Sequence, residues 1–203
     1  KEIPDVTDVL ETMRDLLSEN KPVEAEFLMQ KALIDRGYGK VSISTPVPLC
    51  DLKVKMDSSQ PFKNYRRIID MESGEVTVSW KDNGTHYKRR LFVSRNNDLI
   101  AYRIEGNSVI PKTEICLAVH DPETLIKKCQ SDMGTCYTQG NYLFYSGITE
   151  DGTQYGAVSK VIHSGIVETG KDYITVDKSA SIIVYTKTFV SEDPKIAFEK
   201  YIK

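Results

Sequence analysis

The sequence predicts a mainly β fold: an antiparallel β-sandwich preceded by a helical hairpin and followed by a short C-terminal helix. Three observations predict it. Apolar and polar residues alternate over about ten to twelve short segments, as they do in strands that bury one face. Gly, Asn, Asp and Pro separate these segments at short intervals, which favours antiparallel pairing through tight turns. Helical periodicity is confined to the two ends of the chain.

Residues 5–36 carry the pattern of two helices joined by a turn. Apolar residues recur at spacings of three and four, at Val6, Val9, Leu10, Met13, Leu16 and Leu17 and then at Ala25, Leu28, Met29, Ala32 and Leu33. Asp5 or Thr7 is placed to cap the first helix. Pro22 suits the first turn of the second helix, and Gly37 is a candidate for its C-cap. The pair lacks the basic face of a DNA-binding motif, so we interpret it as a buttress packed on a sheet.

The strand pattern is clearest between residues 65 and 104. Val76, Val78 and Trp80 alternate with polar residues, which places Trp80 on the core face. Asn83-Gly84 predicts a type I′ hairpin turn, because both residues accept a positive φ. Further strands are predicted in CDLKVKM, EICLAVH, GNYLFYSGI, YGAVSKVIHSG, DYITVD and SIIVYTKT, and a short helix in DPETLIKK.

Residues 193–203 predict the start of a linker helix. Asp193 is placed as its cap and Pro194 as its first residue. An apolar stripe follows at Phe198, Tyr201 and Ile202, and we expect this stripe to meet a partner domain. We predict that residues 1–203 form a single β-sandwich domain with the hairpin and the linker helix as appendages.

Composition excludes several classes of protein. The chain has 203 residues, of which 40% are hydrophobic and 28% charged, as in an ordinary globular protein. Its 27 basic and 29 acidic residues give a net charge of -2, so we predict neither a nucleic-acid partner nor a membrane partner. No apolar run approaches the roughly 20 residues that span a bilayer. Because the first residue is Lys1, we expect a processed or cloned piece of a longer chain.

The cysteines and histidines predict no metal site and no cofactor. The cysteines are Cys50, Cys116, Cys129 and Cys136, without a CxxC pair, and the chain has three histidines, whereas zinc usually takes four clustered ligands. Cys129 and Cys136 lie in the loop-like stretch CQSDMGTC. They are either two free thiols or a disulfide, and the redox compartment stays open.

No residue is predicted to be catalytic. Asp70, Glu72, Glu75 and Asp82 are glycosidase-type carboxylates only by residue type, and they lie in or beside turns, where we expect them to be solvated. No nucleophile elbow, phosphate loop or dinucleotide fingerprint is present.

Aromatic residues offer weak signals for sugar binding. Trp80 is interpreted as a core residue rather than as a sugar-stacking platform. Tyr142, Phe144 and Tyr145 alternate between faces, so we expect at least one of them to be exposed.

The motifs of residues 10–104 resemble a known family. The Glu- and Ala-rich helix pair precedes a Pro-Leu-x-Asp-Leu strand and the run YRRIIDMESG. A Val-x-Trp strand, the Gly-x-x-Tyr-x-Arg hairpin and a Phe-x-Ser segment follow, at Val78–Trp80, Gly84–Arg89 and Phe92–Ser94. This pattern is similar to the N-terminal β-sandwich domain of glycoside hydrolase family 95, which comprises α-L-fucosidases and related exo-glycosidases. The likeness is weak between residues 105 and 190, and Cys50 stands where the family has Gly.

The resemblance implies a supersandwich-like fold that supports a C-terminal helical-barrel catalytic domain in a bacterial, exported (secreted or periplasmic) enzyme. The family's catalytic residues lie in that barrel, so none is carried over and the chain alone is expected to be inactive. The family's first strand precedes Lys1, so we expect an open sheet edge that self-associates or is protected by a loop.

The alternative interpretation is a free-standing carbohydrate-binding module. A purely structural or interaction domain is a third possibility. The sugar, the linkage and the oligomeric state stay open.

Overall fold

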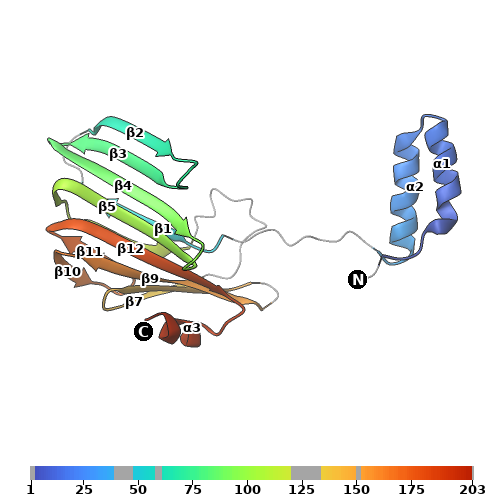
Figure 1. Cartoon of the computed structure of the whole chain (residues 1–203). Helices are drawn as coiled ribbons and strands as arrows, with labels where there is room; N and C mark the ends of the chain where they lie inside the picture. The colour runs from blue at the N-terminus through green and yellow to red at the C-terminus, as the bar shows by residue number, and fades with distance from the viewer. Residues whose placement is uncertain (1–2, 39–47, 58–60, 120–133, 150–151, 203) are drawn as a thin grey trace. The chain divides into compact units, whose positions relative to one another are not determined.

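A computed structural model describes residues 3–38, 48–57, 61–119, 134–149 and 152–202. The chain divides into two compact units, Lys1–Thr45 and Pro46–Lys203, here called the helical unit and the sandwich unit (Figure 1). Each is described by itself. The prediction of a single domain stays a prediction. The same holds for the predicted packing of the helices on a sheet.

The helical unit is the predicted hairpin. A short 3-10 turn, η1 (Thr7–Val9), leads into α1 (Leu10–Ser18), and α2 (Pro22–Asp35) begins at the predicted proline. Gly37 has φ +77°, and its N–H donates to the Ile34 carbonyl while Tyr38 N–H donates to the Leu33 carbonyl. These two bonds are the Schellman motif, which confirms the predicted glycine C-cap.

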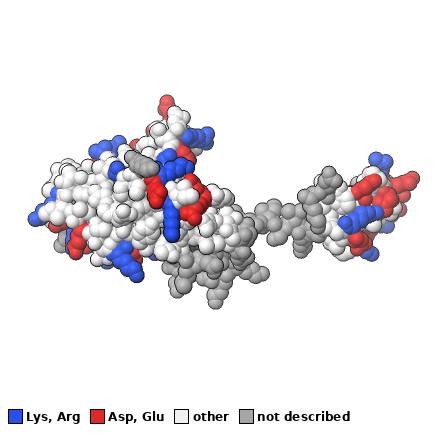
Figure 2. Space-filling model, turned by 90° about the horizontal axis from the view of Figure 1, so that it is seen from below, with Lys and Arg blue, Asp and Glu red and all other residues white. Residues whose placement is uncertain are grey.

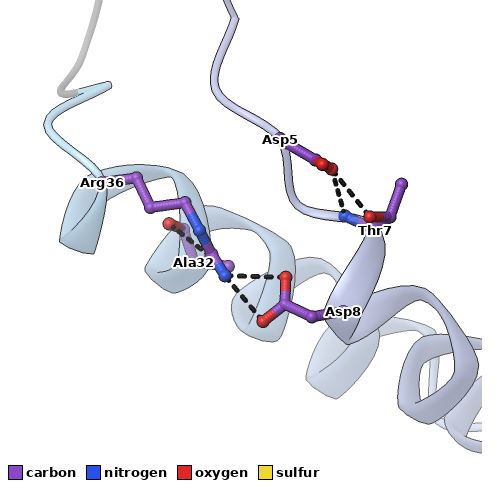
Figure 3. Close-up of polar contacts among 5 residues, drawn as sticks. All are labelled: Asp5, Thr7, Asp8, Ala32 and Arg36. Atoms are coloured by element: carbon purple, nitrogen blue, oxygen red, sulfur yellow. Dashed lines mark hydrogen bonds and ion pairs between the residues drawn. The ribbon is translucent and has the colours of Figure 1, made fainter.

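Polar contacts fasten the start of the helical unit to the end of α2 (Figure 3). The Asp5 carboxylate accepts hydrogen bonds from the backbone N–H and the hydroxyl of Thr7 at 2.9 and 2.7 Å. The Arg36 guanidinium donates to both oxygens of Asp8 at 2.6 and 2.7 Å and to the Ala32 carbonyl. One terminal nitrogen of the guanidinium donates to both Asp8 oxygens and the other donates to the Ala32 carbonyl, so Arg36 joins the start of the unit to the last turn of α2.

The sandwich unit confirms the predicted fold class. Its twelve described strands form two antiparallel sheets, a four-stranded sheet in the order β1-β6-β11-β10 and an eight-stranded sheet in the order β2-β3-β4-β5-β12-β9-β8-β7. The strands are β1 (Asp51–Met56), β2 (Lys63–Ile69), β3 (Val76–Asp82), β4 (Thr85–Ser94), β5 (Leu99–Ile110), β6 (Thr113–Ala118), β7 (Thr135–Gln139), β8 (Tyr142–Ile148), β9 (Gln154–His163), β10 (Ile166–Thr169), β11 (Tyr173–Asp177) and β12 (Ser179–Val190).

Turn chemistry sets the register of the long sheet. Asn83 and Gly84 have φ +43° and +82°, the positive values of the predicted type I′ turn, and this turn pairs Trp80 with Tyr87. Sequence analysis missed β7 and β10. The predicted helix in DPETLIKK lies outside the described residues.

The core fills the space between the sheets. Its buried residues come from β5, β6, β8, β9, β11 and β12, and Leu52, Val54 and Met56 of β1 pack against them. None of the buried residues in this cluster belongs to β2, β3 or β4. The long sheet therefore extends beyond the short one, and Figure 1 shows β2 and β3 at its outer edge. We call β2, β3 and the adjoining part of β4 the overhang.

The C-terminal helix α3 (Pro194–Tyr201) corrects one prediction. Asp193 caps it as expected, accepting from the N–H groups of Lys195 and Ile196. Phe198, however, is only 6% exposed and packs on the outer face of the long sheet against Phe144, with ring centroids 4.6 Å apart. Tyr201 and Ile202 pack against the same cluster. Of the stripe expected to meet a partner domain, Phe198 is covered by this chain's own sheet, and Tyr201 and Ile202 are half-buried.

The surface of the molecule carries charged side chains of both signs (Figure 2). Basic and acidic side chains are interspersed on the face shown in Figure 2, rather than separated into areas of one sign. Among the described helices, none is long and apolar enough to cross a membrane.

Candidate functional site

Three of the four carboxylates considered as catalytic candidates belong to the turn between β2 and β3. Asp70 accepts hydrogen bonds from the backbone N–H groups of Glu72 and Ser73. These bonds, first of all that from Glu72, hold the pKa of Asp70 below its ordinary value. Glu72 is exposed, and Glu75 accepts from the hydroxyl of Thr77. Their environment is that of a solvated turn, as expected.

Asp82 differs from the other three and corrects the expectation of a solvated side chain. It closes β3, pairs with Thr85 across the hairpin and is only 6% exposed. It faces a cleft of about 380 Å³ at one end of the sandwich. The described residues that line this cleft, here called the hairpin cleft, are Asp57, Asp82, Asn83, Thr85, Tyr87, Val109 and Pro111.

Both sheets contribute to the hairpin cleft. The β3–β4 hairpin supplies the four residues from Asp82 to Tyr87, whereas Asp57 follows the last residue of β1. Val109 and Pro111 come from the end of β5 and the link to β6. The described lining thus combines two carboxylates, an amide and two hydroxyl groups with two apolar side chains.

Trp80 lies beside the cleft and is half-buried, outside both core clusters. Its ring stacks on that of Tyr87 at a centroid distance of 5.4 Å, and the Arg89 guanidinium lies 4.8 Å from its centre. Arg89 also donates to the sulfur of Met56. The interpretation of Trp80 as a core residue is therefore corrected: it lies on the inner face of the overhang, where the core does not reach.

Tyr87 is a buried residue of the cleft whose ring is packed against its neighbours. It is 6% exposed, and its ring lies against Gly106, where an added Cβ would stand 3.2 Å from it. The neighbouring His86 N–H donates to the Asn107 side chain at 3.0 Å, which ties the hairpin to β5. Tyr87 thus offers one fixed aromatic wall.

The aromatic run of β8 offers no exposed platform. Phe144 and Tyr145 are each 1% exposed, the first beneath α3 and the second in the core. Tyr142 is half-buried, and its hydroxyl donates to the Ile202 carbonyl at 3.3 Å. None of the three is exposed, so the expectation that at least one would be is wrong: α3 covers Phe144 and contacts Tyr142, and the core encloses Tyr145.

The described cysteines Cys50, Cys116 and Cys136 carry free thiols, and Cys129 lies outside the described residues. Burial, with smaller contributions from Cys136 and Asp51, raises the pKa of the Cys50 thiol to about 12. Over the described part of the chain, no group of three His, Cys, Asp or Glu side chains is arranged to hold a metal ion.

Large apolar side chains gather on and beside β2, the edge strand of the long sheet. All seven residues of this strand are exposed. We call the following set the β2 surface: Phe62, Tyr65, Ile68, Ile69 and Met71, with exposed fractions between 44% and 87%. Because neighbouring side chains of a strand point to opposite faces, these residues expose apolar area on both faces of the edge strand, and exposed apolar area is typical of surfaces that meet a partner.

One of the comparisons with known proteins identifies the family of this chain. A family model described as "Glycosyl hydrolase family 65, N-terminal domain" matches residues 2–189. Fifteen solved chains match, among them "Putative kojibiose phosphorylase from human microbiome" at 18% identity, covering 68% of this chain and 19% of that one. The TM-score of that match is 0.41. The search of curated proteins found no match.

The family match supports an N-terminal domain of the glycoside-hydrolase kind, as predicted. It points to family 65, whereas the motifs of residues 10–104 pointed to family 95, which the match does not show. Sequence analysis considered Asp82 but missed the rest of the hairpin cleft. The type I′ turn at Asn83-Gly84 was the one signal that could have placed Thr85 opposite Asp82, since the turn fixes that register.

Proposed function

Because the chain belongs to the family described as the N-terminal domain of glycosyl hydrolase family 65, we propose that it is a non-catalytic sandwich domain supporting a catalytic domain in a longer parent chain. The family match over residues 2–189 is the observation that carries this proposal. The chain spans 19% of the solved kojibiose phosphorylase chain, so the activity of the parent is itself part of the proposal.

The chemistry of the turn carboxylates supports a non-catalytic role. A glycosidase needs two carboxyl groups placed across a pocket on either side of the scissile bond. Asp70 and Glu75 instead accept hydrogen bonds within their own turn, and Glu72 projects from it into solvent.

The β2 surface is the part of the sandwich unit that we propose meets the catalytic domain. The stripe on α3 is buried at Phe198 and half-buried at Tyr201 and Ile202, whereas Ile69 and Met71 are 63% and 87% exposed. Burying such side chains against a partner removes apolar area from water, worth roughly 25 cal/mol per Å². An edge strand also offers unpaired N–H and C=O groups to a partner.

The finer proposal concerns the parent enzyme. The motifs shared with family 95 favour an exo-glycosidase of the α-L-fucosidase or α-galactosidase type with a helical-barrel catalytic domain, exported from a bacterial cell. Assay of the parent chain on aryl α-L-fucoside and aryl α-D-galactoside tests this. Cleavage of neither, with phosphorolysis of a glucosyl disaccharide instead, would place the parent with the phosphorylases.

The supporting role is tested by Ile69→Asp, made both in the parent chain and in the 203-residue chain. The interface residues that carry the binding energy cost more than about 1 kcal/mol when truncated, so the variant should lower the melting temperature of the parent and leave that of the shorter chain nearly unchanged. Ile166→Asp is the matched control, because Ile166 is 60% exposed and lies on β10, in the other sheet. Equal effects of both variants in the parent would contradict the proposed contact.

A further inference from the structure

The hairpin cleft has the features of a small-molecule site, and we propose that it binds one neutral sugar unit. This goes beyond the supporting role and does not rest on it. The cleft measures about 380 Å³, within the range of roughly 300–1,000 Å³ typical of ligand pockets. It lies where the overhang passes the edge of the short sheet, so residues from both sheets converge on it.

The polar groups of the cleft match the hydroxyls of a sugar. The Asp57 carboxylate is exposed at the rim, and a carboxylate accepts hydrogen bonds from two neighbouring hydroxyl groups. Asn83 and Thr85 both donate and accept through an amide and a hydroxyl. Hydrogen bonds to an ionised acceptor are the stronger ones, which makes Asp57 the residue that we expect to dominate affinity.

The apolar part of the lining suits the C–H side of a pyranose ring. Val109 is 55% exposed, and with Pro111 it forms a wall from the β5–β6 side. The Tyr87 ring is also part of the lining and is held in place between Trp80 and Gly106. A ligand with one apolar side and a rim of hydroxyls meets both kinds of wall.

Charge narrows the ligand class further. The exposed carboxylate of Asp57 gives the rim of the cleft negative charge, and no Lys or Arg is among the described lining residues, which disfavours uronic acids and sugar phosphates. A metal ion is disfavoured because the described residues hold no cluster of three acidic, His or Cys ligands. Once charged sugars and metal ions are disfavoured, the ligand class that fits the cleft is a neutral hexose or deoxyhexose.

The experiment is a titration of the isotope-labelled 203-residue chain with D-glucose, D-galactose and L-fucose, followed by two-dimensional NMR. At least one sugar should give saturable shifts at the amides of Asp57, Asn83 and Thr85. A single sugar unit in an open cleft should bind with a Kd on the order of 1 mM. Trp80, the only tryptophan, gives a second readout through its stacking on Tyr87.

Variants locate the binding. Asp57→Asn should weaken the affinity at least about 5-fold, since the acceptor loses its charge, and Thr85→Val should weaken it similarly. Glu168→Gln is the matched control, because Glu168 is exposed on β10, at the opposite edge of the short sheet from β1. It should bind like the unaltered chain.

Three results would overturn the proposal. One is the absence of saturable shifts up to about 100 mM, a hundredfold above a millimolar Kd. Another is unchanged affinity in both Asp57→Asn and Thr85→Val. The third is that calcium chloride alone, and none of the sugars, shifts the same amides, which would make the cleft a cation site.

Discussion

Phe198→Ala probes the contact that fixes α3 to the sandwich unit. The ring is 6% exposed and meets Phe144 at 4.6 Å, Tyr137 at 5.6 Å and Phe189 at 5.7 Å between ring centroids. The substitution removes all three contacts at once. It leaves Asp193 and its cap untouched.

The expected cost follows from the burial and the ring contacts. Burying a Phe side chain is worth about 1.5–3 kcal/mol, and each aromatic pair adds about 0.5–1.5 kcal/mol. Phe→Ala changes in well-packed sites cost about 3–5 kcal/mol. Because α3 is terminal and can detach instead of leaving a cavity, we expect the lower end, about 3 kcal/mol.

Urea unfolding of the 203-residue chain measures this cost, with circular dichroism and Trp80 emission as probes. Ile196→Ala is the control on the same helix, since Ile196 is 61% exposed and should change stability by less than about 0.5 kcal/mol. If the two variants have the same free energy of unfolding, Phe198 does not anchor α3 and the described packing is incorrect.

Three further predictions concern the sandwich unit. Gly156→Ala should cost about 1–3 kcal/mol, because a Cβ there collides with the Tyr145 carbonyl oxygen; an unchanged melting temperature would contradict this close approach. Thr186→Val removes the buried 2.7 Å hydroxyl contact with Ser159 and should cost about 1–3 kcal/mol in urea unfolding, part of which the added change Ser159→Ala should restore. The raised pKa of Cys50, about 12 against an ordinary 9.0, means that the folded chain keeps a proton that the unfolded chain releases; stability from this group is complete below pH 9 and declines as pH rises from 9 to 12. At pH 8 Ellman's reagent should modify Cys50 only on unfolding, and rapid labelling of Cys50 in a native chain whose other cysteines are replaced by Ser would refute this.

The elements that sequence analysis predicted correctly are those set by local chemistry. The β3–β4 hairpin follows from Asn83-Gly84, whose positive φ values only such residues accept readily. The helix ends follow from Pro22, Gly37 and Asp193 in the same way. In each case a few residues that are adjacent in the sequence are sufficient to predict the turn or the helix end.

The errors concern residues whose surroundings are set by distant parts of the chain. Trp80 has the alternation of a core residue, but its strand lies in the overhang, and no local pattern shows that the short sheet ends at β1. Phe198 has the pattern of a partner-facing stripe, yet β8 and β12 supply its cover. The hairpin cleft joins Asp57 to Tyr87 across two sheets, a pairing that periodicity does not contain.

Missed strands have a different cause. β10 is four residues long and wholly exposed, so it shows no alternation of burial. β7 begins at Thr135, directly after a stretch that reads as a loop. Short edge strands such as these depend on a neighbouring strand for their conformation more than on their own residues.

The most direct test of the central claim is a glycosidase assay of the 203-residue chain beside its parent. The substrates are aryl α-L-fucoside, aryl α-D-galactoside and a glucosyl disaccharide with phosphate. We predict no turnover above buffer for the shorter chain and turnover of at least one substrate by the parent. Turnover by the shorter chain that disappears in Asp57→Asn or Asp82→Asn would contradict the claim, because the hairpin cleft would then be an active site rather than part of a supporting domain.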